Sequence, residues 1–456
     1  MRKVPYLVVI VLCWYSCSLK EESVSFDSNL ELFFSNDSVA FDTLLTDSRS
    51  STQRLTIFNP NEAAIQLSRI ALGLGSSSDY SVVINGRSTD ELFNEQILGS
   101  DSLLVLVEVD ISPRNRNLPY LVKDSLIVEW NGNSKHVKFV TYGQDGIRKK
   151  NQVVCDEVWT RERPYIVSDT LLVPPGCQLT IEPGARVLFE NDAVMLVQGT
   201  LTANGTSDAR IEFRNTRFDG IYDEVPGQWN GIYFLQGSQD NLVTHANIYN
   251  AQIGLSIGFP GNTDVPDLTV RSSKIYNMSF AGLLGFTSQI DASNLLIYNC
   301  GTYLVGNFAG GDYSYNHCTL VNDPSFFVRD EPSVQFSDNL VLENDEVITR
   351  NLRVNATNCI IWGSGEEELL ISQSGGTSPQ AEIVSNIIRS ASELEGNFTS
   401  LDFDFPGFTD PFSFNYTLDT LAFAKDKGIP TSLLKDLNGN DRDAKPDIGA
   451  FERIEK

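Results

Sequence analysis

The sequence is poor in positive charge, in histidine and in methionine. It has 34 Lys and Arg against 59 Asp and Glu, a formal net charge of −25, with 3 His and 3 Met. Such an acidic surface repels polyanions, which argues against nucleic-acid binding and against docking on an anionic bilayer through a basic patch. A Ser-His-Asp order, an HExxH motif, a phosphate-binding glycine loop and a CxxC motif are all absent. The enzyme classes that depend on them are therefore not indicated.

The chain is rich instead in residues that form strands and turns. It has 33 Gly, 26 Phe and 15 Tyr, and no convincing amphipathic helix follows the N-terminus. This composition fits an all-β protein. Its 456 residues exceed what one ordinary core holds, so two or more domains are expected.

The tripeptide Ile-Tyr-Asn is repeated at residues 248–250, 275–277 and 297–299. A looser form of the pattern follows at 320–322, 361–363 and 388–390. Counted from residue 250, the steps are 27, 22, 23, 41 and 27 residues, and we interpret 41 as two unmarked steps. A period in the low twenties with β-branched residues predicts a β-solenoid, in which each turn buries its apolar face against its neighbours.

In a solenoid of parallel strands about 4.8 Å apart, like residues stack on like. We therefore expect Ile to point into the core and Asn to mark a bend, since Asn bonds the backbone and tolerates left-handed geometry. The direction of Tyr stays open. An outward row would make a sugar-stacking face, and an inward row would be packed core.

The N-terminus carries two basic residues, an apolar stretch over residues 4–15 and the pair Ser16-Cys17. The stretch is too short to span a bilayer comfortably and reads as a secretory signal. The Ser-Cys junction resembles a bacterial lipoprotein signal, which implies that Cys17 becomes the lipidated first mature residue. The alternatives are a plain signal peptide and a short membrane anchor. The following Ser-Leu-Lys-Glu-Glu resembles the surface-export signal of some Gram-negative lipoproteins, so we expect a lipid-anchored protein at the outer membrane or cell surface.

Five cysteines remain beyond this signal, and an odd number leaves at least one free thiol. Cys300, Cys318 and Cys359 fall beside the repeat positions, where we expect them to pack as small core residues. Cys155 and Cys177 flank the start of the repeats and can pair, although sequence alone does not show their geometry.

Two further segments resemble known families. RLTIFNPNEAAIQLSRIAL resembles the immunoglobulin-like modules of exported bacterial proteins, which implies a spacer or cap, with adhesion as the alternative. PYIV, LTIEPGARVLF, GTLTANGT, IEF and WNGI resemble the entry coils of right-handed parallel β-helices of the pectate-lyase-like superfamily. The tail DLNGNDRDAKPDIGAFE resembles a motif that follows such β-helices, and we expect it to close the open apolar end of the solenoid.

The expected fold is all-β, with an N-terminal β-sandwich followed by a right-handed parallel β-helix. The expected domains are a signal peptide over 1–17, a tether over 18–24, an immunoglobulin-like sandwich over 25–148, a β-helix over 149–425 and a cap over 426–456.

One metal site is considered. Asp436, Asn438, Asn440 and Asp447 have calcium-loop spacing, but Asp441 stands where an EF-hand needs Gly. The alternative, which we prefer, is a turn-rich cap. The sequence therefore predicts no cofactor, with calcium at these four residues as the one candidate.

No catalytic set is visible. Asp264 and Asp267 superficially resemble an Asn-Thr-Asp motif of polygalacturonases, but no basic partner follows, so a solvated loop is preferred. His245 and His317 lie 72 residues apart, about three coils or ~15 Å, which is too far for a catalytic pair.

Residues 231–321 contain only Arg271 and Lys274 as cations, which argues against a lyase site for anionic uronates on the middle coils. We therefore expect a surface lipoprotein that binds glycan or protein through the β-helix face. The alternative is a polysaccharide lyase or glycoside hydrolase, and a purely structural envelope role is a third. Expected partners are a polysaccharide or cell-surface protein, and the membrane through the lipid; the catalytic and ligand-binding residues are not indicated.

Overall fold

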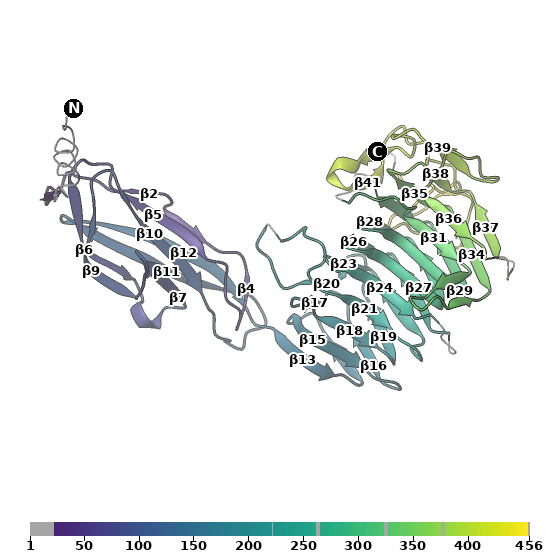
Figure 1. The fold of residues 1–456 in the computed structure, drawn as a ribbon, viewed down its shortest axis with the longest axis horizontal. Helices are drawn as coiled ribbons and strands as arrows, with labels where there is room; N and C mark the ends of the chain where they lie inside the picture. The colour runs from purple at the N-terminus through teal and green to yellow at the C-terminus, as the bar shows by residue number, and fades with distance from the viewer. Residues whose placement is uncertain are drawn as a thin grey trace, which may run out of the picture. The chain divides into compact units, whose positions relative to one another are not determined.

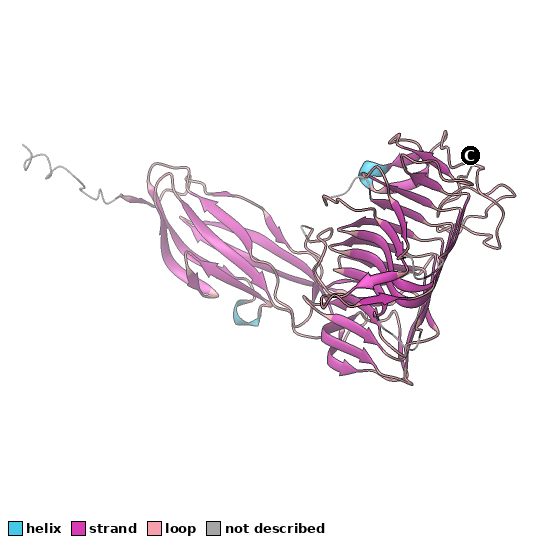
Figure 2. Cartoon of the chain, turned by 45° about the vertical axis from the view of Figure 1, so that its right-hand side comes forward, coloured by secondary structure: helices cyan, strands magenta, loops and turns pink. Residues whose placement is uncertain are grey.

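The computed structural model describes residues 22–220, 222–260, 265–322, 327–374, 377 and 379–454. Nearly all regular structure is strand, as Figure 2 shows. The chain divides into two compact units, Met1–Asp145 and Gly146–Lys456. The expected domain boundary after residue 148 falls inside the first strand of the second unit, so the structural boundary lies three residues earlier. Cys17 and the predicted signal lie outside the described residues, and no described helix is long and apolar enough to cross a membrane.

The first unit is built from two sheets (Figure 1). One contains β1 (Val24–Ser25), β3 (Ser38–Ala40), β4 (Leu44–Leu45), β6 (Ala64–Leu72), β9 (Glu91–Ile97), β11 (Tyr120–Trp130) and β12 (Asn133–Gln144). The other contains β2 (Phe33–Phe34), β5 (Gln53–Phe58), β7 (Tyr80–Ile84), β8 (Arg87–Ser88) and β10 (Ser102–Val109). A short 3-10 helix, η2 (Gly75–Ser77), precedes β7.

Alternation of apolar and polar residues makes these sheets a sandwich. In β10, Leu103, Val105 and Val107 are buried, and they share one core with Leu126 and Val128 of β11 in the opposite sheet. Each strand thus turns one face inward, as two packed sheets require.

The second unit is a parallel β-helix. In its described residues, 25 strands form one sheet that winds around a single core, and its strands stack as three walls (Figure 1). The IYN wall holds the first parts of β13 (Ile147–Val153) and β15 (Tyr165–Val173), then β17 (Arg186–Phe189), β20 (Ile211–Asn215), β23 (Ala246–Tyr249), β26 (Lys274–Met278), β28 (Leu296–Cys300), β30 (Thr319–Asn322), β35 (Ile360–Gly363), β38 (Ile387–Arg389) and β39 (Phe398–Ser400).

The second wall follows the IYN wall in each coil. It holds the last parts of β13 and β15, then β18 (Val194–Val197), β21 (Gly231–Phe234), β24 (Ile253–Gly258), the first parts of β27 (Ala281–Ser293) and β29 (Tyr303–Asn316), β31 (Val334–Ser337) and β36 (Leu369–Ser372). The third wall holds β14 (Glu157–Trp159), β16 (Gln178–Ile181), β19 (Thr200–Asn204), β22 (Asn241–Thr244), β25 (Asp267–Arg271), the last parts of β27 and β29, β34 (Leu352–Thr357) and β37 (Gln380–Val384).

Outside these walls lie two hairpins and a short 3-10 helix. They are β32 (Asn339–Val341) with β33 (Val347–Thr349), β40 (Phe408–Asp410) with β41 (Asn415–Leu418), and η3 (Pro411–Ser413).

The repeated tripeptides stack in register, which confirms the predicted solenoid. Ile248 pairs with Ile275, and Ile275 with Ile297, with all three side chains buried in the core. The interpretation of the 41-residue step as two coils is wrong, because Leu320 pairs directly with Ile361. The extra residues form the β32–β33 hairpin and neighbouring loops, so one coil is enlarged and none is unmarked.

The Asn residues of the repeats sit at left-handed bends and form a buried amide ladder. Asn250, Asn277 and Asn299 have φ of 63°, 56° and 51°. The Nδ2 of Asn299 donates to Asn277 Oδ1 at 2.7 Å, Asn277 donates to Asn250 at 3.4 Å, and Asn250 donates to Asn215 at 2.9 Å. The ladder ends where Asn215 donates to Gln228 Oε1 at 3.0 Å. Each amide therefore fixes one coil upon the next.

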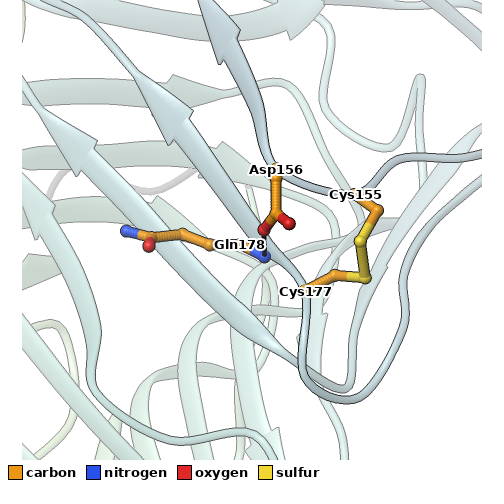
Figure 3. The surroundings of a disulfide bond; sticks show 4 residues. All are labelled: Cys155, Asp156, Cys177 and Gln178. Carbon is orange, nitrogen blue, oxygen red and sulfur yellow. Dashed lines mark hydrogen bonds between the residues drawn. A yellow bond between two sulfur atoms is a disulfide. The ribbon is translucent and has the colours of Figure 1, made fainter.

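A disulfide joins the first coils. Cys155 and Cys177 are bonded, with their Cα atoms 4.7 Å apart, and beside them the amide of Gln178 donates to Asp156 Oδ1 at 3.2 Å (Figure 3). The bond closes a separation of 22 residues, about one coil. Loop-closure entropy gives such a bond a stabilisation of about 3 kcal/mol.

The other described cysteines are core residues, as predicted. Cys300, Cys318 and Cys359 are unpaired and fully buried. Burial raises the pKa of Cys300 to about 12, so its thiol stays protonated at neutral pH.

The C-terminal strap (residues 414–454) lies along the flank of the IYN wall and does not close the end of the solenoid. Ser385 Oγ donates to Lys427 O at 3.1 Å, whereas Arg210, six coils earlier, donates to Leu437 O at 2.8 Å. Apolar side chains that point outward from the wall, such as Trp362, pack beneath the strap. The strap therefore runs back along the wall, which corrects the expected cap over 426–456.

The end of the solenoid is covered by a nearer loop. Leu394 packs against the core from residues 391–397, just after β38. In the same loop, Asn397 Nδ2 donates to Ile383 O of β37 at 2.7 Å. The chain thus covers its last coil before it turns back.

We expect Asn277→Ala to destabilise the β-helix by about 3 kcal/mol, because it leaves buried amide groups unpaired and replaces Asn, which tolerates a left-handed bend, with a residue that does not. Asn277→Gly removes the same hydrogen bonds but accepts the positive φ, so its loss should be about 1 kcal/mol smaller. Urea unfolding of the three proteins measures both effects, and equal stability of the wild type and Asn277→Ala would contradict the ladder's role.

Candidate functional site

The tyrosines of the repeats point outward, but they do not form a sugar-stacking face. Tyr249 and Tyr276 stack with ring centroids 4.8 Å apart and planes 6° apart, and Tyr276 and Tyr298 stack at 4.9 Å and 3°. The Arg214 guanidinium lies 5.1 Å from the Tyr249 ring at one end, and Phe414 lies 5.3 Å from Tyr298 at the other. The ring faces thus contact each other or the protein, and a sugar stacks on an open face.

The phenol hydroxyls of this row are neutral at physiological pH. Burial raises the pKa of Tyr249 to about 12, and it also raises the pKa values of Tyr276 and Tyr298. The stack is therefore a structural feature of the wall.

The four predicted calcium ligands bind protein groups. Asp436 Oδ1 accepts hydrogen bonds from the amides of Asn438 and Asn440 at 2.9 and 2.8 Å. Both carboxylate oxygens of Asp447 accept backbone amides, at 2.8 and 2.7 Å. Gly439, with φ of 86°, makes the turn. These residues form a hydrogen-bonded turn of the strap, and the described chain holds no cluster of three or more His, Cys, Asp or Glu side chains suited to a metal.

The two histidines of the repeats occupy one row of bends. His245 and His317 have φ of 46° and 52°, three coils apart, so they form no pair. His317 Nε2 accepts from Asn358 Nδ2 at 2.9 Å, and its Nδ1 donates to Gly449 O of the strap at 3.3 Å. This arrangement requires a neutral ring.

The predicted acidic loop is described only in part. Asp264 lies outside the described residues. Asp267 begins β25, and its Oδ1 accepts the amide of Asp240 at 2.8 Å.

The site that sequence reasoning missed is a pocket of about 540 Å³ on the third wall, which we call the turn pocket. Along its wall, Gln289, Asp312, Arg353 and Gln380 stand in register on four consecutive coils. The neighbours Ile290, Tyr313 and Val354 are buried, so the first three side chains point outward, and Gln380 is exposed and accepts from Arg353 beside them. The row spans ~14 Å at the usual strand spacing. The remaining lining residues are Val265, Thr287, Ser288, Gly311, Arg350, Asn351 and Leu352.

The floor of the turn pocket is a tight bend between the second and third walls. Ala309, Gly310 and Gly311 have φ of 57°, 72° and 134°. A Cβ on Gly311 would lie 2.5 Å from the carbonyl oxygen of Ser288, so only glycine fits there. The Tyr313 hydroxyl donates to Gly310 O at 2.8 Å from inside the core.

The interior beneath this bend is unusually polar. Asn307 Nδ2 donates to the Tyr315 hydroxyl at 2.8 Å, and the hydroxyls of Ser288 and Tyr313 lie 3.4 Å apart. All four residues are fully buried, and burial raises the pKa of Tyr313 to about 12. Hydrogen bonds thus hold the Tyr313 and Tyr315 hydroxyls beneath the bend, while Asn307 Oδ1 has no partner among the described groups.

The electrostatics of the turn pocket differ from those of the whole chain. Arg353 NH1 binds Asp312 Oδ2 at 2.9 Å, and its Nε donates to Gln380 Oε1 at 3.4 Å. The Arg350 guanidinium donates to the carbonyl of its neighbour Thr349, at 2.9 Å, and no described carboxylate forms an ion pair with it. Two guanidinium groups and one carboxylate give the lining one net positive charge in a chain of net charge −25.

The irregular coil is the reason that the sequence pattern did not predict this pocket. Arg350 and Arg353 follow the β32–β33 hairpin, beyond the cation-poor stretch 231–321, and only the strand register sets them beside Gln289 and Asp312. Spacing in the sequence does not show this arrangement.

Comparisons with known proteins assign no family. No family model matches the chain. A segment of 118 residues, 24% of the chain, is 30% identical to Protein bark beetle of Drosophila melanogaster. The chain spans only 4% of that relative's length.

Among solved structures, a family 123 glycoside hydrolase from Clostridium perfringens aligns over 29% of this chain and 30% of its own, with 7% identity and a TM-score of 0.20. The catalytic domain of a GH87 α-1,3-glucanase in complex with nigerose aligns over 76% and 91%, with 9% identity and a TM-score of 0.15. PapD-like domain 7 of human CEP192 aligns over 29% and 94%, with 15% identity and a TM-score of 0.17. Likenesses this weak carry no functional argument.

The neutral His317 predicts a pH dependence of stability. Burial, aided by the charge of Arg442, lowers its pKa from 6.5 to about 3. Between these values the unfolded chain binds a proton that the folded protein does not, so stability falls as the pH falls below 6.5. At one pKa unit per 1.4 kcal/mol, the loss from this group at pH 5 is about 2 kcal/mol.

Urea unfolding of the wild type and His317→Gln at pH 7 and pH 5 tests this expectation. The variant keeps a hydrogen-bonding side chain but has no proton to bind, so it should lose about 2 kcal/mol less than the wild type between the two pH values. Equal losses in both proteins would contradict it.

Proposed function

We propose that this protein is a lipid-anchored surface protein whose β-helix binds glycans in the turn pocket. The observation that carries the proposal is the row of Gln289, Asp312, Arg353 and Gln380, four polar side chains that converge on one pocket from consecutive coils. Amides, a carboxylate and a guanidinium supply both donors and acceptors, which suits sugar hydroxyl groups that both donate and accept. Binding sites of this kind use a few well-placed polar groups on a rigid scaffold.

The chemistry of the pocket favours binding over cleavage. Glycoside hydrolases generally need two carboxyl groups, one of them free to give a proton. Asp312 is the one carboxylate among the described lining residues, and it is engaged by Arg353 at 2.9 Å. A polysaccharide lyase or glycoside hydrolase remains the alternative, and the binding experiment below includes a cleavage measurement for it.

The finer features expected from the sequence belong to this proposal. The first unit is proposed to be an immunoglobulin-like spacer between the lipid anchor and the β-helix. The β-helix is proposed to be right-handed and pectate-lyase-like, since parallel crossovers strongly favour that hand. The disulfide between Cys155 and Cys177 supports export, because such bonds persist in oxidising compartments.

The first test measures retention of the full chain, in detergent, on affinity gels that contain neutral or acidic polysaccharides. We expect at least one glycan to retain the wild type, and Gln289→Ala with Gln380→Ala to weaken that binding about 30-fold, since each hydrogen bond is worth about 1 kcal/mol. Asn355→Ala is the matched control, because this amide lies on the same wall outside the pocket.

Retention that the double variant leaves unchanged would contradict the pocket assignment, and no retention on any glycan would contradict glycan binding. New reducing ends that appear with the wild type and disappear with Asp312→Asn would favour the enzyme alternative.

The anchor is tested by labelling cells with a radioactive fatty acid. We expect Cys17→Ala to abolish incorporation and to release the protein from the membrane fraction, because the acyl chains supply the membrane affinity. Cys13→Ala is the control and should remain labelled, since Cys13 would be removed with the signal. Label that persists in Cys17→Ala would exclude the lipoprotein interpretation.

A further inference from the structure

Among the described residues, no carboxylate forms an ion pair with Arg350, which lines the turn pocket. It joins β33 to β34, and its backbone amide donates to Asp338 O at 2.8 Å. The neighbouring coil presses against it, because a Cβ on Gly310 would lie 2.6 Å from the carbonyl oxygen of Arg350. The backbone is thus fixed, while the exposed guanidinium donates to the adjacent carbonyl of Thr349.

Other arginines of the third wall are neutralised by an adjacent coil. Arg271 binds Asp291 at 2.8 Å, and Arg353 binds Asp312 at 2.9 Å, in each case across one coil step. Arg350 has no such partner among the described residues. An exposed guanidinium on a fixed backbone, with no described carboxylate paired to it, at the rim of a polar pocket, is a ready site for an anionic group.

We infer that the glycan bound in the turn pocket carries widely spaced acidic groups, carboxylate or sulfate, one of which binds Arg350. This inference rests on the proposed function of the same pocket. The row of Gln289, Asp312, Arg353 and Gln380 binds the neutral, hydroxyl-bearing sugars of the glycan. Arg350, at the side of the pocket, binds its acidic sugar.

The same geometry disfavours a glycan with an acid on every sugar. Asp267 stands in the same row two coils from Asp312, ~10 Å at the usual strand spacing, and no described cation forms an ion pair with it, so a continuous polyanion along the row would meet an uncompensated carboxylate. The net charge of −25 adds long-range repulsion. One unpaired cation compensates a single acidic group, which selects sparse charge.

The experiment compares three polysaccharides on the full chain: gellan, whose carboxylates are widely spaced; carboxyl-reduced gellan; and polygalacturonate, in which every sugar carries a carboxylate. Wild type should bind gellan most tightly. Arg350→Gln should weaken gellan binding about tenfold, as expected for one charge-assisted contact, and should leave the reduced form unchanged. Arg271→Gln, which removes one charge from the same wall outside the pocket, should change neither. A sulfated glycan of similar charge spacing distinguishes sulfate from carboxylate.

The outcomes separate this inference from the proposal beneath it. Equal binding of gellan and its reduced form would overturn acid recognition, and so would an Arg350→Gln protein that binds both as the wild type does. In either case, binding that still depends on Gln289 and Gln380 would support the glycan site itself. Tightest binding of polygalacturonate would overturn the preference for sparse charge. Failure of all glycans to bind would overturn the glycan site itself.

Discussion

The coils of the β-helix are held in register by a chain of buried side-chain amides. It runs from Asn299 through Asn277, Asn250 and Asn215 to Gln228, with every donor aimed in the same direction. In a low-dielectric interior such bonds are strong, and each unmade bond is costly, so the ladder fixes both the bend and the stacking of its coils. The isoleucine column inside and the tyrosine stack outside follow from the register that the ladder imposes.

The ladder also reaches the loop at its end. Gln228 Nε2 donates to the carbonyls of Tyr222 and Val225 at 2.7 and 2.8 Å, and Asn250 Nδ2 donates to Asp223 O at 2.9 Å. The loop is thereby tied to the IYN wall beside Tyr249. At the other end of the tyrosine stack, Phe414 of the strap covers Tyr298. A wall whose aromatic rings suggest ligand binding is thus used for internal packing, since covering apolar surface stabilises the unit.

The third wall is free of this strap packing and has a different chemistry. Its bend carries three successive positive φ values, from Ala309 to Gly311, and the core behind the bend contains hydroxyl and amide groups in place of aliphatic side chains. Regular stacking supplies a rigid row of side chains, and the enlarged coil that follows adds Arg350 at the rim. The combination of a repetitive scaffold with one irregular coil creates a pocket that neither supplies alone.

The sequence by itself determined the class of fold and much of its register. Ile at 248, 275 and 297 and Asn at 250, 277 and 299 predicted which residues enter the core and which bend the chain, because both preferences are local properties of side chain and backbone. It also placed Cys300, Cys318 and Cys359 in the core. Only the tertiary structure decided the rest: the enlarged coil between Leu320 and Ile361, the course of the strap along the flank, and the placing of Gln289 and Arg353 in one pocket. These depend on contacts between residues many positions apart, whose pairing is set by packing over the whole unit and not by local preference.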